Sequence, residues 1–364
     1  MILLYIFGIV ALINCAYFFL FSKFAFSKPS HIQLKENYSI SLIICAKNEA
    51  ENLQNHIPLW LNQKYPNFEL ILINDASNDD TLEVMQKFAE EHPKIQIVNV
   101  KSNEAFWGNK KYALTLGIKR AKNHRLVFSD ADCYPASENW LSNMVSNFSE
   151  KKQIVLGYGA YEKQPGFINK VIRYETLITA VQYFSYAQIG IPYMGVGRNL
   201  AYTSTLYYEK NGFINHIKIA SGDDDLFVNE AATPKNTAIC DNQEAFTYSI
   251  PKQNRKQWLK QKRRHYSTSK YYKPLHKFLL GLFYISSFSF WLFSIIILFT
   301  NFWTIGLAII VLRLSIQYIV IGKAAKKLKE ANLLLFVPFY ELFLILTQMS
   351  IFISNSEEKK SQWK

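Results

Sequence analysis

The sequence predicts an α/β fold with a mostly parallel β-sheet, flanked by helices that cross a membrane. Between Ser39 and about Ile250, short apolar runs alternate with amphipathic helical stretches, which is the pattern of βαβ units. Outside this stretch lie apolar segments of about twenty residues with almost no charge, the length that a helix needs to cross a bilayer. The 364 residues therefore leave room for one α/β domain besides the membrane segments.

The order of strands and helices in the α/β region follows from these apolar runs. The predicted strands are Ser39–Ala46, Phe68–Asn74, Ile95–Val100 and Arg125–Ser129. The predicted helices between them are Asn48–Gln63, Thr81–Glu91 and Lys110–Lys122. Residues 166–190, rich in Tyr, Phe and Ile, are predicted to form a helix that lies either at the membrane interface or in the core. Because ligands bind beyond the carboxyl ends of strands in open α/β sheets, the polar residues after each strand are candidates for a binding site.

Four apolar segments are predicted to span the membrane. The first, residues 1–22, lacks the basic start and the small-residue cleavage site of a signal peptide, so we expect a retained anchor. The other predicted spans are Leu275–Thr300, Phe302–Ile321 and Ala331–Ser354. The predicted organisation is an anchor at 1–22, an α/β domain at 38–250, a basic interfacial segment at 251–274, three spans within 275–354 and a tail at 355–364.

The lysines and arginines predict the orientation of the spans. The net charge is +13, and residues 252–273 carry nine Lys and Arg and no acid. A second group of lysines, between 323 and 329, lies on the same side if the spans alternate. Since basic segments stay in the cytoplasm, the α/β domain is predicted to be cytoplasmic, in a plasma or inner membrane. Anionic lipid and pyrophosphate explain this charge better than nucleic acid does, so no nucleic-acid partner is expected.

Asp130 and Asp132 directly follow a predicted strand. Two carboxylates two residues apart at the end of a buried strand can give oxygen ligands to a divalent cation and leave positions open for a diphosphate. Such a cation neutralises a departing nucleoside diphosphate. Asp-x-Asp pairs are also common on protein surfaces, so a surface pair stays the alternative for these two residues considered alone.

A second acidic group comprises Asp223, Asp224 and Asp225, which follow Gly222. Three adjacent carboxylates repel one another, which raises the pKa of at least one of them and helps that group to accept a proton. A hydroxyl nucleophile needs such a base as its new bond forms. A helix N-terminus, where acids satisfy free backbone amides, is the alternative explanation and is compatible with the first.

Together these groups resemble the family 2 glycosyltransferases, inverting enzymes with the Rossmann-like GT-A fold that include polysaccharide synthases and ceramide glucosyltransferase. The resemblance covers about residues 41–265. Asn48 and Glu49 match the Asn-Glu pair that holds the nucleotide in this family. Asn-Asp-Ala-Ser at 74–77 is similar to the family's Asp-Asp-Gly-Ser, in which Asp75 matches an acid that contacts the base or ribose. This sequence departs from that pattern at the first and third residues.

The resemblance also assigns the phosphate and metal residues. Residues 108–114 are similar to the family's Gly-x-Lys-x-x-Ala-Leu, which implies that Lys110 binds the nucleotide or its phosphates; an exposed lysine in a first helical turn is the alternative. Asp130 and Asp132 match the metal motif, which implies Mg or Mn with Asp132 as the direct ligand. Residues 195–200 resemble a glycine-rich segment that lines the sugar pocket.

The remaining matches concern the base and the pyrophosphate. The second acidic group resembles the family's catalytic pair, which implies Asp224 as the general base and Asp223 as the second candidate. Gln261 and Arg264 match the family's Gln-x-x-Arg-Trp, in which the arginine pairs with pyrophosphate. His265 stands where tryptophan is usual and offers a smaller stacking face to an acceptor sugar.

The resemblance therefore implies a membrane-bound glycosyltransferase of the cell envelope, of the hexosyltransferase type, with a UDP sugar as the default donor. The expected partners are a nucleotide sugar, a lipid or glycan acceptor and membrane lipid. The histidine at 265 and the small number of spans favour one sugar added to a lipid or lipid-linked acceptor, with a processive polysaccharide synthase as the alternative. A non-catalytic membrane scaffold is the alternative of another class, and it predicts loss of a metal or base carboxylate, which this sequence does not show.

Overall fold

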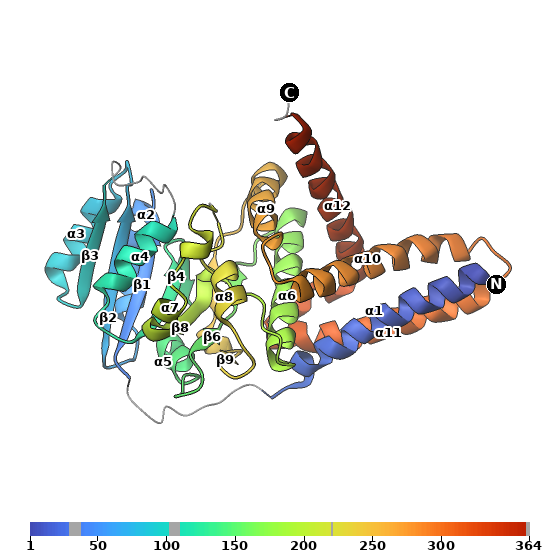
Figure 1. Cartoon of the computed structure of the whole chain (residues 1–364), viewed down its shortest axis with the longest axis horizontal. Helices are drawn as coiled ribbons and strands as arrows, with labels where there is room; N and C mark the ends of the chain where they lie inside the picture. Colours follow the sequence, from blue (N-terminus) through green and yellow to red (C-terminus); the bar gives the residue numbers. More distant parts are fainter. Residues whose placement is uncertain (29–37, 102–109, 220, 362–364) are drawn as a thin grey trace. The chain divides into compact units, whose positions relative to one another are not determined.

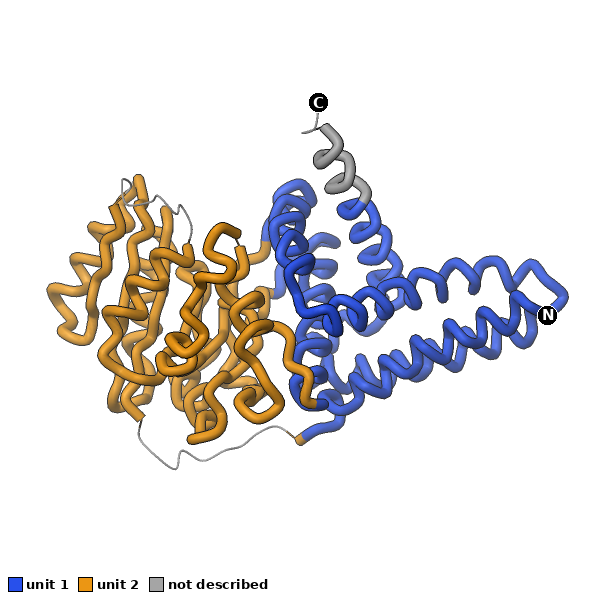
Figure 2. Tube along the Cα trace, in the orientation of Figure 1, with its two compact units in different colours: residues 1–27, 163–189, 252–364 blue, residues 28–162, 190–251 orange. Residues whose placement is uncertain are grey.

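The computed structural model describes residues 1–28, 38–101, 110–219 and 221–361. The chain divides into two compact units, which Figure 2 colours separately. Unit 1 comprises residues 1–27, 163–189 and 252–364, and unit 2 comprises residues 28–162 and 190–251. The aromatic-rich segment after residue 162 thus belongs with the apolar helices of unit 1, while the domain boundaries drawn from the sequence stay a prediction.

Unit 2 is built on a seven-stranded sheet with the order β3-β2-β1-β4-β8-β6-β9, shown in Figure 1. Its strands are β1 (Ile40–Ala46), β2 (Phe68–Asp75), β3 (Ile95–Val100), β4 (Arg125–Asp130), β6 (Ile154–Leu156), β8 (Leu200–Thr203) and β9 (Thr237–Ile239). The first four strands are parallel, whereas β8 runs antiparallel to β4 and β6. The predicted α/β fold with a mostly parallel sheet is confirmed.

Helices connect these strands, and a smaller sheet follows β4. The helices of unit 2 are α2 (Ala50–Leu61), α3 (Thr81–Glu91), α4 (Lys110–Arg120), α5 (Trp140–Val145), α7 (Ser204–Glu209) and α8 (Asp225–Ala231), with 3-10 helices η2 (Gly197–Asn199), η3 (Ile214–His216) and η4 (Gln243–Ala245). The smaller sheet has the order β5-β10-β7, with β5 (Cys133–Pro135), β7 (Gly159–Tyr161) and β10 (Thr247–Ser249). The predicted strands and helices between residues 39 and 130 occur within two residues of their expected ends.

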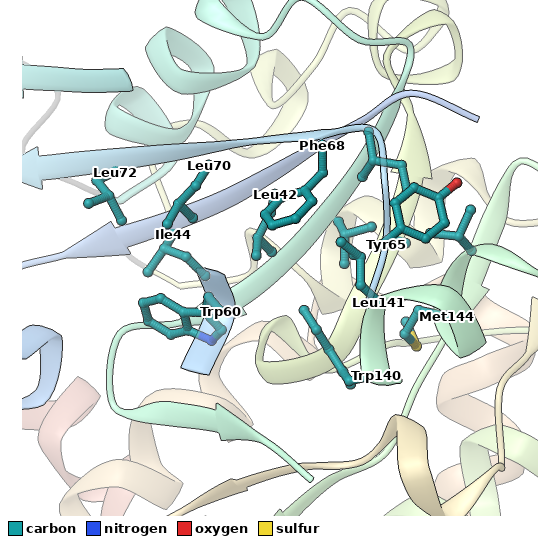
Figure 3. Packing of buried hydrophobic residues seen from close by; sticks show 14 of the residues in the cluster. Leu42, Ile44, Trp60, Tyr65, Phe68, Leu70, Leu72, Trp140, Leu141 and Met144 are labelled. Atoms are coloured by element: carbon teal, nitrogen blue, oxygen red, sulfur yellow. The ribbon is translucent and has the colours of Figure 1, made fainter. Parts of the chain in front are cut away.

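The core of unit 2 explains why the first strands show no alternation of apolar and polar residues. Every residue of β1 is buried, as expected for a strand covered on both faces. In Figure 3, Leu42 and Ile44 of β1 lie beside Leu70 and Leu72 of β2, and Trp60 of α2 packs in the same cluster. The packing of these strands fixes the carboxyl ends of β1, β2 and β4, which the predicted site residues follow.

Unit 1 is helical within the described residues. Its helices are α1 (Ile2–Phe26), α6 (Phe167–Gln188), α9 (Arg255–Ser269), α10 (Pro274–Ile297), α11 (Trp303–Lys327), the 3-10 helix η5 (Ala331–Phe336) and α12 (Val337–Ser361). Four segments are long and apolar enough to cross a membrane: Ile2–Phe26, Pro274–Ile297, Trp303–Lys327 and Ala331–Phe352. Their number and positions agree with the sequence prediction, although the last segment begins as a 3-10 helix.

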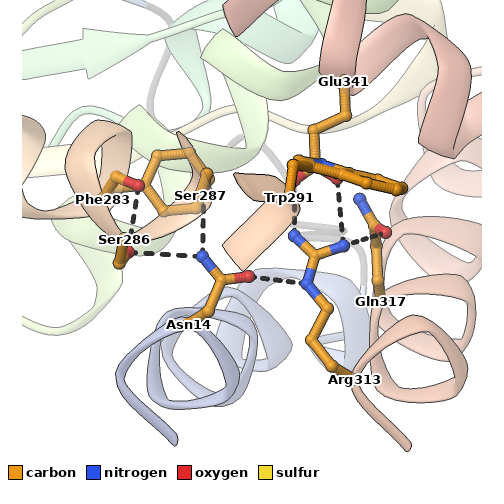
Figure 4. A network of polar contacts seen from close by, with 8 residues as sticks. All are labelled: Asn14, Phe283, Ser286, Ser287, Trp291, Arg313, Gln317 and Glu341. Carbon is orange, nitrogen blue, oxygen red and sulfur yellow. Dashed lines mark hydrogen bonds and ion pairs between the residues drawn. The ribbon is translucent and has the colours of Figure 1, made fainter. Parts of the chain in front are cut away.

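A polar network is buried among these apolar helices (Figure 4). Arg313 of α11 is fully buried, and its guanidinium donates to Asn14 Oδ1 at 2.7 Å, to Gln317 Oε1 at 2.6 Å and to both carboxylate oxygens of Glu341 at 3.0 and 2.5 Å. Trp291 Nε1 also donates to Glu341, at 3.1 Å. A buried charge is very costly unless it is paired and hydrogen-bonded. The network therefore joins α1, α10, α11 and α12 through a fully paired charge.

Candidate active site at the carboxyl edge of the sheet

Two loops after β1 and β2 are bound to each other. The backbone N–H of Asn48 donates to Ser77 Oγ at 3.0 Å, and Asn48 Oδ1 accepts from the N–H of Asn78 at 2.8 Å. The N–H of Glu49, which immediately precedes α2, donates to Thr81 Oγ1 at 2.8 Å. The nucleotide residues predicted after β1 therefore lie beside the turn that follows β2.

Asp75 ends β2 and is half-buried at the start of that turn. The next residue, Ala76, has a φ of 49°, which lies in the left-handed region that favours glycine. Asn74 donates from Nδ2 to Asn99 Oδ1 at 2.8 Å, and its Oδ1 accepts from the N–H of Ser77 at 3.2 Å. The two departures from the family pattern are thus accommodated, because alanine takes the conformation of glycine and the amide finds partners.

Lys110, at the start of α4, connects the end of β4 with the second acidic group. Its Nζ lies 2.6 Å from Asp130 Oδ1 and 3.1 Å from Asp223 Oδ2. Burial lowers the pKa of Lys110, but these two carboxylates outweigh burial and raise it well above its usual value. Burial raises the pKa of Asp223, and the ammonium of Lys110 outweighs it and lowers the pKa below the usual range. Gly108 and Asn109, part of the same predicted motif, lie outside the described residues.

These three residues share one pocket with the predicted base. The pocket is lined by Lys110, Leu114, Phe128, Ser129, Asp130, Gly197, Leu200, Tyr202, Asp223 and Asp224. Gly197 and Leu200 come from the glycine-rich segment that the sequence placed at the sugar pocket. The structure therefore brings together residues from α4, β4, η2, β8 and the loop before α8, which are far apart in the sequence.

Asp224 is held in place by backbone N–H groups. Its Oδ2 accepts from the N–H of Gly197 at 2.7 Å, and its Oδ1 accepts from the N–H of Asp225, the first residue of α8, at 2.8 Å. Burial, followed by the carboxylates of Asp223 and Asp225, raises the pKa of Asp224 to about 7. Asp224 therefore caps α8, and its raised pKa is suited to a general base, so the two sequence interpretations stay compatible.

Asp130 and Asp132 can hold a divalent cation. Their carboxylate oxygens and the sulfur of Cys133 all lie within 4.8 Å of one another. The thiol of Cys133 donates to Asp132 Oδ1 at 3.4 Å, and burial raises the pKa of this thiol well above its usual value. The hard carboxylate oxygens are the candidate donors, since they fit Mg²⁺ or Mn²⁺ better than the soft sulfur does.

Lys111 is a residue that the sequence did not single out. It is only 1% exposed, and its ammonium donates to the carbonyl oxygens of His216, Ile219 and Ser221 at 2.8, 2.9 and 2.7 Å. These carbonyls lie in the loop that leads to Asp223. Burial lowers the pKa of Lys111 to about 8. No sequence signal marks this contact, because its two sides are about a hundred residues apart in the chain.

Gln261 and Arg264 lie on α9 in unit 1. Arg264 and His265 are exposed, and Gln261 is half-buried. Lys262 of the same motif pairs with Glu175 of α6, at 2.8 Å from Nζ to Oε1. Contacts within unit 1 therefore orient α9, and the assignment of Gln261 and Arg264 to the pyrophosphate stays a prediction.

Known proteins resemble this chain in sequence. Residues 41–204 match the sequence model of the family described as Glycosyl transferase family 2. A poly-beta-1,6-N-acetyl-D-glucosamine synthase of Staphylococcus epidermidis is 29% identical over 177 residues, which are 48% of this chain and 39% of that protein. An uncharacterized glycosyltransferase of Haemophilus influenzae is 30% identical over 134 residues, 35% of this chain and 40% of that protein. The chain thus matches about two fifths of the length of these relatives.

A solved structure shares the fold. A mannosyltransferase from Pyrobaculum calidifontis, in complex with GDP-mannose and Mn²⁺, superposes with a TM-score of 0.59 and covers 93% of this chain and 98% of its own. The two sequences are 16% identical, so the likeness concerns the fold alone. It agrees with the GT-A fold that the sequence predicts.

Proposed function

We propose, from the match of residues 41–204 to the model of glycosyltransferase family 2, that the chain is a membrane-bound inverting glycosyltransferase. It moves a sugar from a nucleotide sugar, by default a UDP sugar, to a hydroxyl of a lipid or lipid-linked acceptor. The observation that carries the proposal is the pocket in which a carboxylate with a pKa of about 7, Asp224, lies with Lys110 and Asp130. A base, a cation and a candidate metal ligand are the groups that this reaction needs.

The donor is held by residues from both loops and from the metal site. Asp132 and Asp130 hold Mg²⁺ or Mn²⁺, which neutralises the leaving nucleoside diphosphate when it is bound. The residues proposed to hold the nucleotide sugar are Asn48, Glu49, Asp75, Lys110, Asp130, Gln261 and Arg264. Lys110 brings a positive charge into the pocket, next to the candidate metal ligand Asp130.

Asp224 acts on the acceptor. Its carboxylate takes the proton of the acceptor hydroxyl while the hydroxyl oxygen forms a bond to the anomeric carbon. The bond from that carbon to the diphosphate breaks on the opposite face, so the configuration inverts and the electron pair leaves with the nucleoside diphosphate. The N–H groups of Gly197 and Asp225 fix the orientation of the carboxylate before the acceptor arrives.

The acceptor distinguishes two candidate functions. His265 in place of tryptophan favours addition of one sugar to a lipid. The curated relatives include poly-beta-1,6-N-acetyl-D-glucosamine synthases, which favours a processive polysaccharide synthase as the second candidate. A ladder of long products would establish the second candidate, and a single product with one added sugar would establish the first.

A non-catalytic scaffold receives no support from the site. That function predicts loss of a carboxylate from the metal pair or from the base position, and Asp130, Asp132 and Asp224 are all present. Asp130 and Asp224 also line one pocket.

The test is release of nucleoside diphosphate by the full chain in detergent, with Mn²⁺, a lipid extract and a panel of UDP and GDP sugars. We expect turnover that depends on Mn²⁺ in the wild type, a loss of about 10²- to 10⁴-fold in Asp224→Asn, and no change in the exposed control Glu150→Gln. Equal turnover in the wild type and Asp224→Asn would move the base role to Asp223. No turnover with any donor in either protein would contradict the proposed reaction.

A further inference from the structure

Arg198 lies between the predicted base and the predicted metal site. The preceding residue, Gly197, donates its N–H to Asp224. The carbonyl of Arg198 accepts from Ser129 Oγ and from Thr247 Oγ1, both at 2.9 Å, and Ser129 is the residue directly before the metal pair. The backbone of Arg198 is therefore fixed to β4 and β10 next to the candidate metal ligands.

The side chain of Arg198 is held by the smaller sheet. Nη1 donates to the carbonyl of Ala160 at 3.2 Å and to Ser249 Oγ at 3.3 Å, and the guanidinium lies over the ring of Tyr161, 4.2 Å from its centre. Gly159 leaves the room for it, because a Cβ at that position would come within 2.9 Å of Arg198 Cβ and 3.2 Å of Nε. One edge of the guanidinium is thus packed and hydrogen-bonded in a fixed orientation.

The other edge of the Arg198 guanidinium makes no hydrogen bond to the described residues. Among the described residues, neither Nε nor Nη2 of Arg198 has a hydrogen-bond acceptor, and no carboxylate forms a direct ion pair with the guanidinium. The side chain is half-buried rather than sealed. Burial lowers the pKa of Arg198, but Tyr161, Cys133, Asp132 and Asp130 outweigh burial and raise it, so both metal-site carboxylates act on this charge. The Nε and Nη2 groups form one edge of the fork, and they match two oxygens of a phosphate or carboxylate.

We propose that Arg198 binds oxygens of the donor's diphosphate through Nε and Nη2, as a fixed positive group beside the cation held by Asp130 and Asp132. This inference rests on the proposed function, because it needs a diphosphate at the metal pair. A guanidinium that is already oriented by Tyr161 and Ser249 loses little conformational freedom when the anion binds. Arg198 then stabilises the negative charge that grows on the leaving group.

The test measures ligand binding and does not depend on turnover. Calorimetry on the full chain in detergent would give the affinity for Mn²⁺ and, with Mn²⁺ present, for UDP, GDP, ADP and dTDP. In Arg198→Gln we expect about tenfold to hundredfold weaker binding of the preferred nucleoside diphosphate, the range for hydrogen bonds to charged groups. We expect the affinity for Mn²⁺ to stay the same or rise, because a positive charge near both carboxylates is removed.

Two further variants and a control complete the design. Arg198→Lys keeps the charge without the fork and should recover only part of the diphosphate affinity. Gly159→Ala keeps Arg198 but displaces its side chain, and should weaken diphosphate binding. The control is Arg125→Gln. Arg125 is another arginine of unit 2 that lies over an aromatic ring, the ring of Tyr38, but it stands at the opposite end of β4 from Asp130. This variant should bind diphosphate like the wild type.

The outcomes separate the inference from its premise. Equal diphosphate affinity in the wild type and Arg198→Gln would overturn the inference and leave the proposed function standing. Loss of both Mn²⁺ and diphosphate binding in Arg198→Gln would also overturn it, since that result indicates a structural role. A wild type that binds none of the four nucleoside diphosphates with Mn²⁺ would overturn the proposed function, and the inference with it.

Discussion

Each unit contains a cluster of charged side chains, and the two clusters differ in how they are balanced. In unit 1, Arg313 and Glu341 are 0% and 9% exposed and their charges are paired one to one; the guanidinium also donates to two amide oxygens, and an indole donates to the carboxylate. In unit 2, Lys110 and Asp130 are 35% and 30% exposed, and the single ammonium faces two carboxylates. The first cluster is complete without a ligand, whereas the second has excess negative charge that a cation can neutralise.

This difference separates a structural cluster from a candidate catalytic one. A buried ion pair whose hydrogen bonds are all made has no donor or acceptor free to bind a substrate. Removing one partner of such a pair strongly destabilises the fold. A partly exposed group of acids with perturbed pKa values in a pocket is typical of a site that handles protons or cations. Variants in unit 1 should therefore change stability, and variants in unit 2 should change activity.

The largest effect is expected for Arg313→Met. The substitution leaves the carboxylate of Glu341 buried without its cation, which costs about 3–5 kcal/mol of folding free energy. We expect little folded protein after extraction, measured by size-exclusion chromatography and thermal unfolding in detergent.

Two variants make this prediction specific. The double variant Arg313→Met/Glu341→Leu should recover most of the stability, because an apolar pair of similar size replaces the ion pair. The exposed control Arg120→Met should unfold like the wild type. Normal stability of Arg313→Met alone would show that the network does not hold the helices together.

The next effect concerns Lys111→Met. The substitution removes the three hydrogen bonds from Lys111 to the carbonyls of His216, Ile219 and Ser221, which precede the proposed base in the chain, and a displacement of about 1 Å at the reacting groups can lower turnover about a hundredfold. We expect kcat to fall while KM for the nucleotide sugar stays nearly constant, since the loops after β1 and β2 are untouched. Lys119→Met, an exposed position on the same helix, is the control. A rise in KM with unchanged kcat would contradict a positioning role.

Lys111 also shows what could be predicted from the sequence. The strands β1, β2 and β4 were predictable because each is a continuous apolar run bounded by polar residues. Asp130 and Asp132 became candidates because they directly follow such a run, and Asp224 because it lies among three adjacent acids; their roles stay predictions. The partners of Lys111 are backbone carbonyls, which every residue has, so no side-chain pattern identifies them. The same holds for Arg198, whose orientation depends on a ring and a glycine in β7.

The four long apolar helices repeat this division. Length and hydropathy were sufficient to place these four candidate spans, because a bilayer imposes one requirement on every helix that crosses it. The pairing of Arg313 with Glu341 was not predictable, since it depends on which faces of α11 and α12 meet. Elements set by local composition could be derived, and contacts between distant elements could not.

A smaller effect is expected for the pH dependence of turnover. A general base acts when it is deprotonated, and the raised pKa of Asp224, about 7, means that the active form is lost as the pH falls through that value. We expect kcat/KM to decrease about tenfold per pH unit below about 6.5 and to level off above about 7.5. Rates measured from pH 5 to 8 with saturating Mn²⁺ give the profile. A flat profile down to pH 5 would indicate a base with an ordinary carboxylate pKa.

The smallest effect is expected for Ala76→Gly, and it tests whether the turn after β2 is strained. Ala76 has a φ of 49°, where glycine is favoured over alanine, so the substitution should raise stability by about 0.5–1 kcal/mol. Ala89→Gly, in the last turn of α3, should lower stability by up to about 1 kcal/mol. Thermal unfolding of the two variants should therefore shift in opposite directions. A loss of stability in both would mean that the turn is not strained by alanine and that the departure from the family's glycine has no energetic consequence.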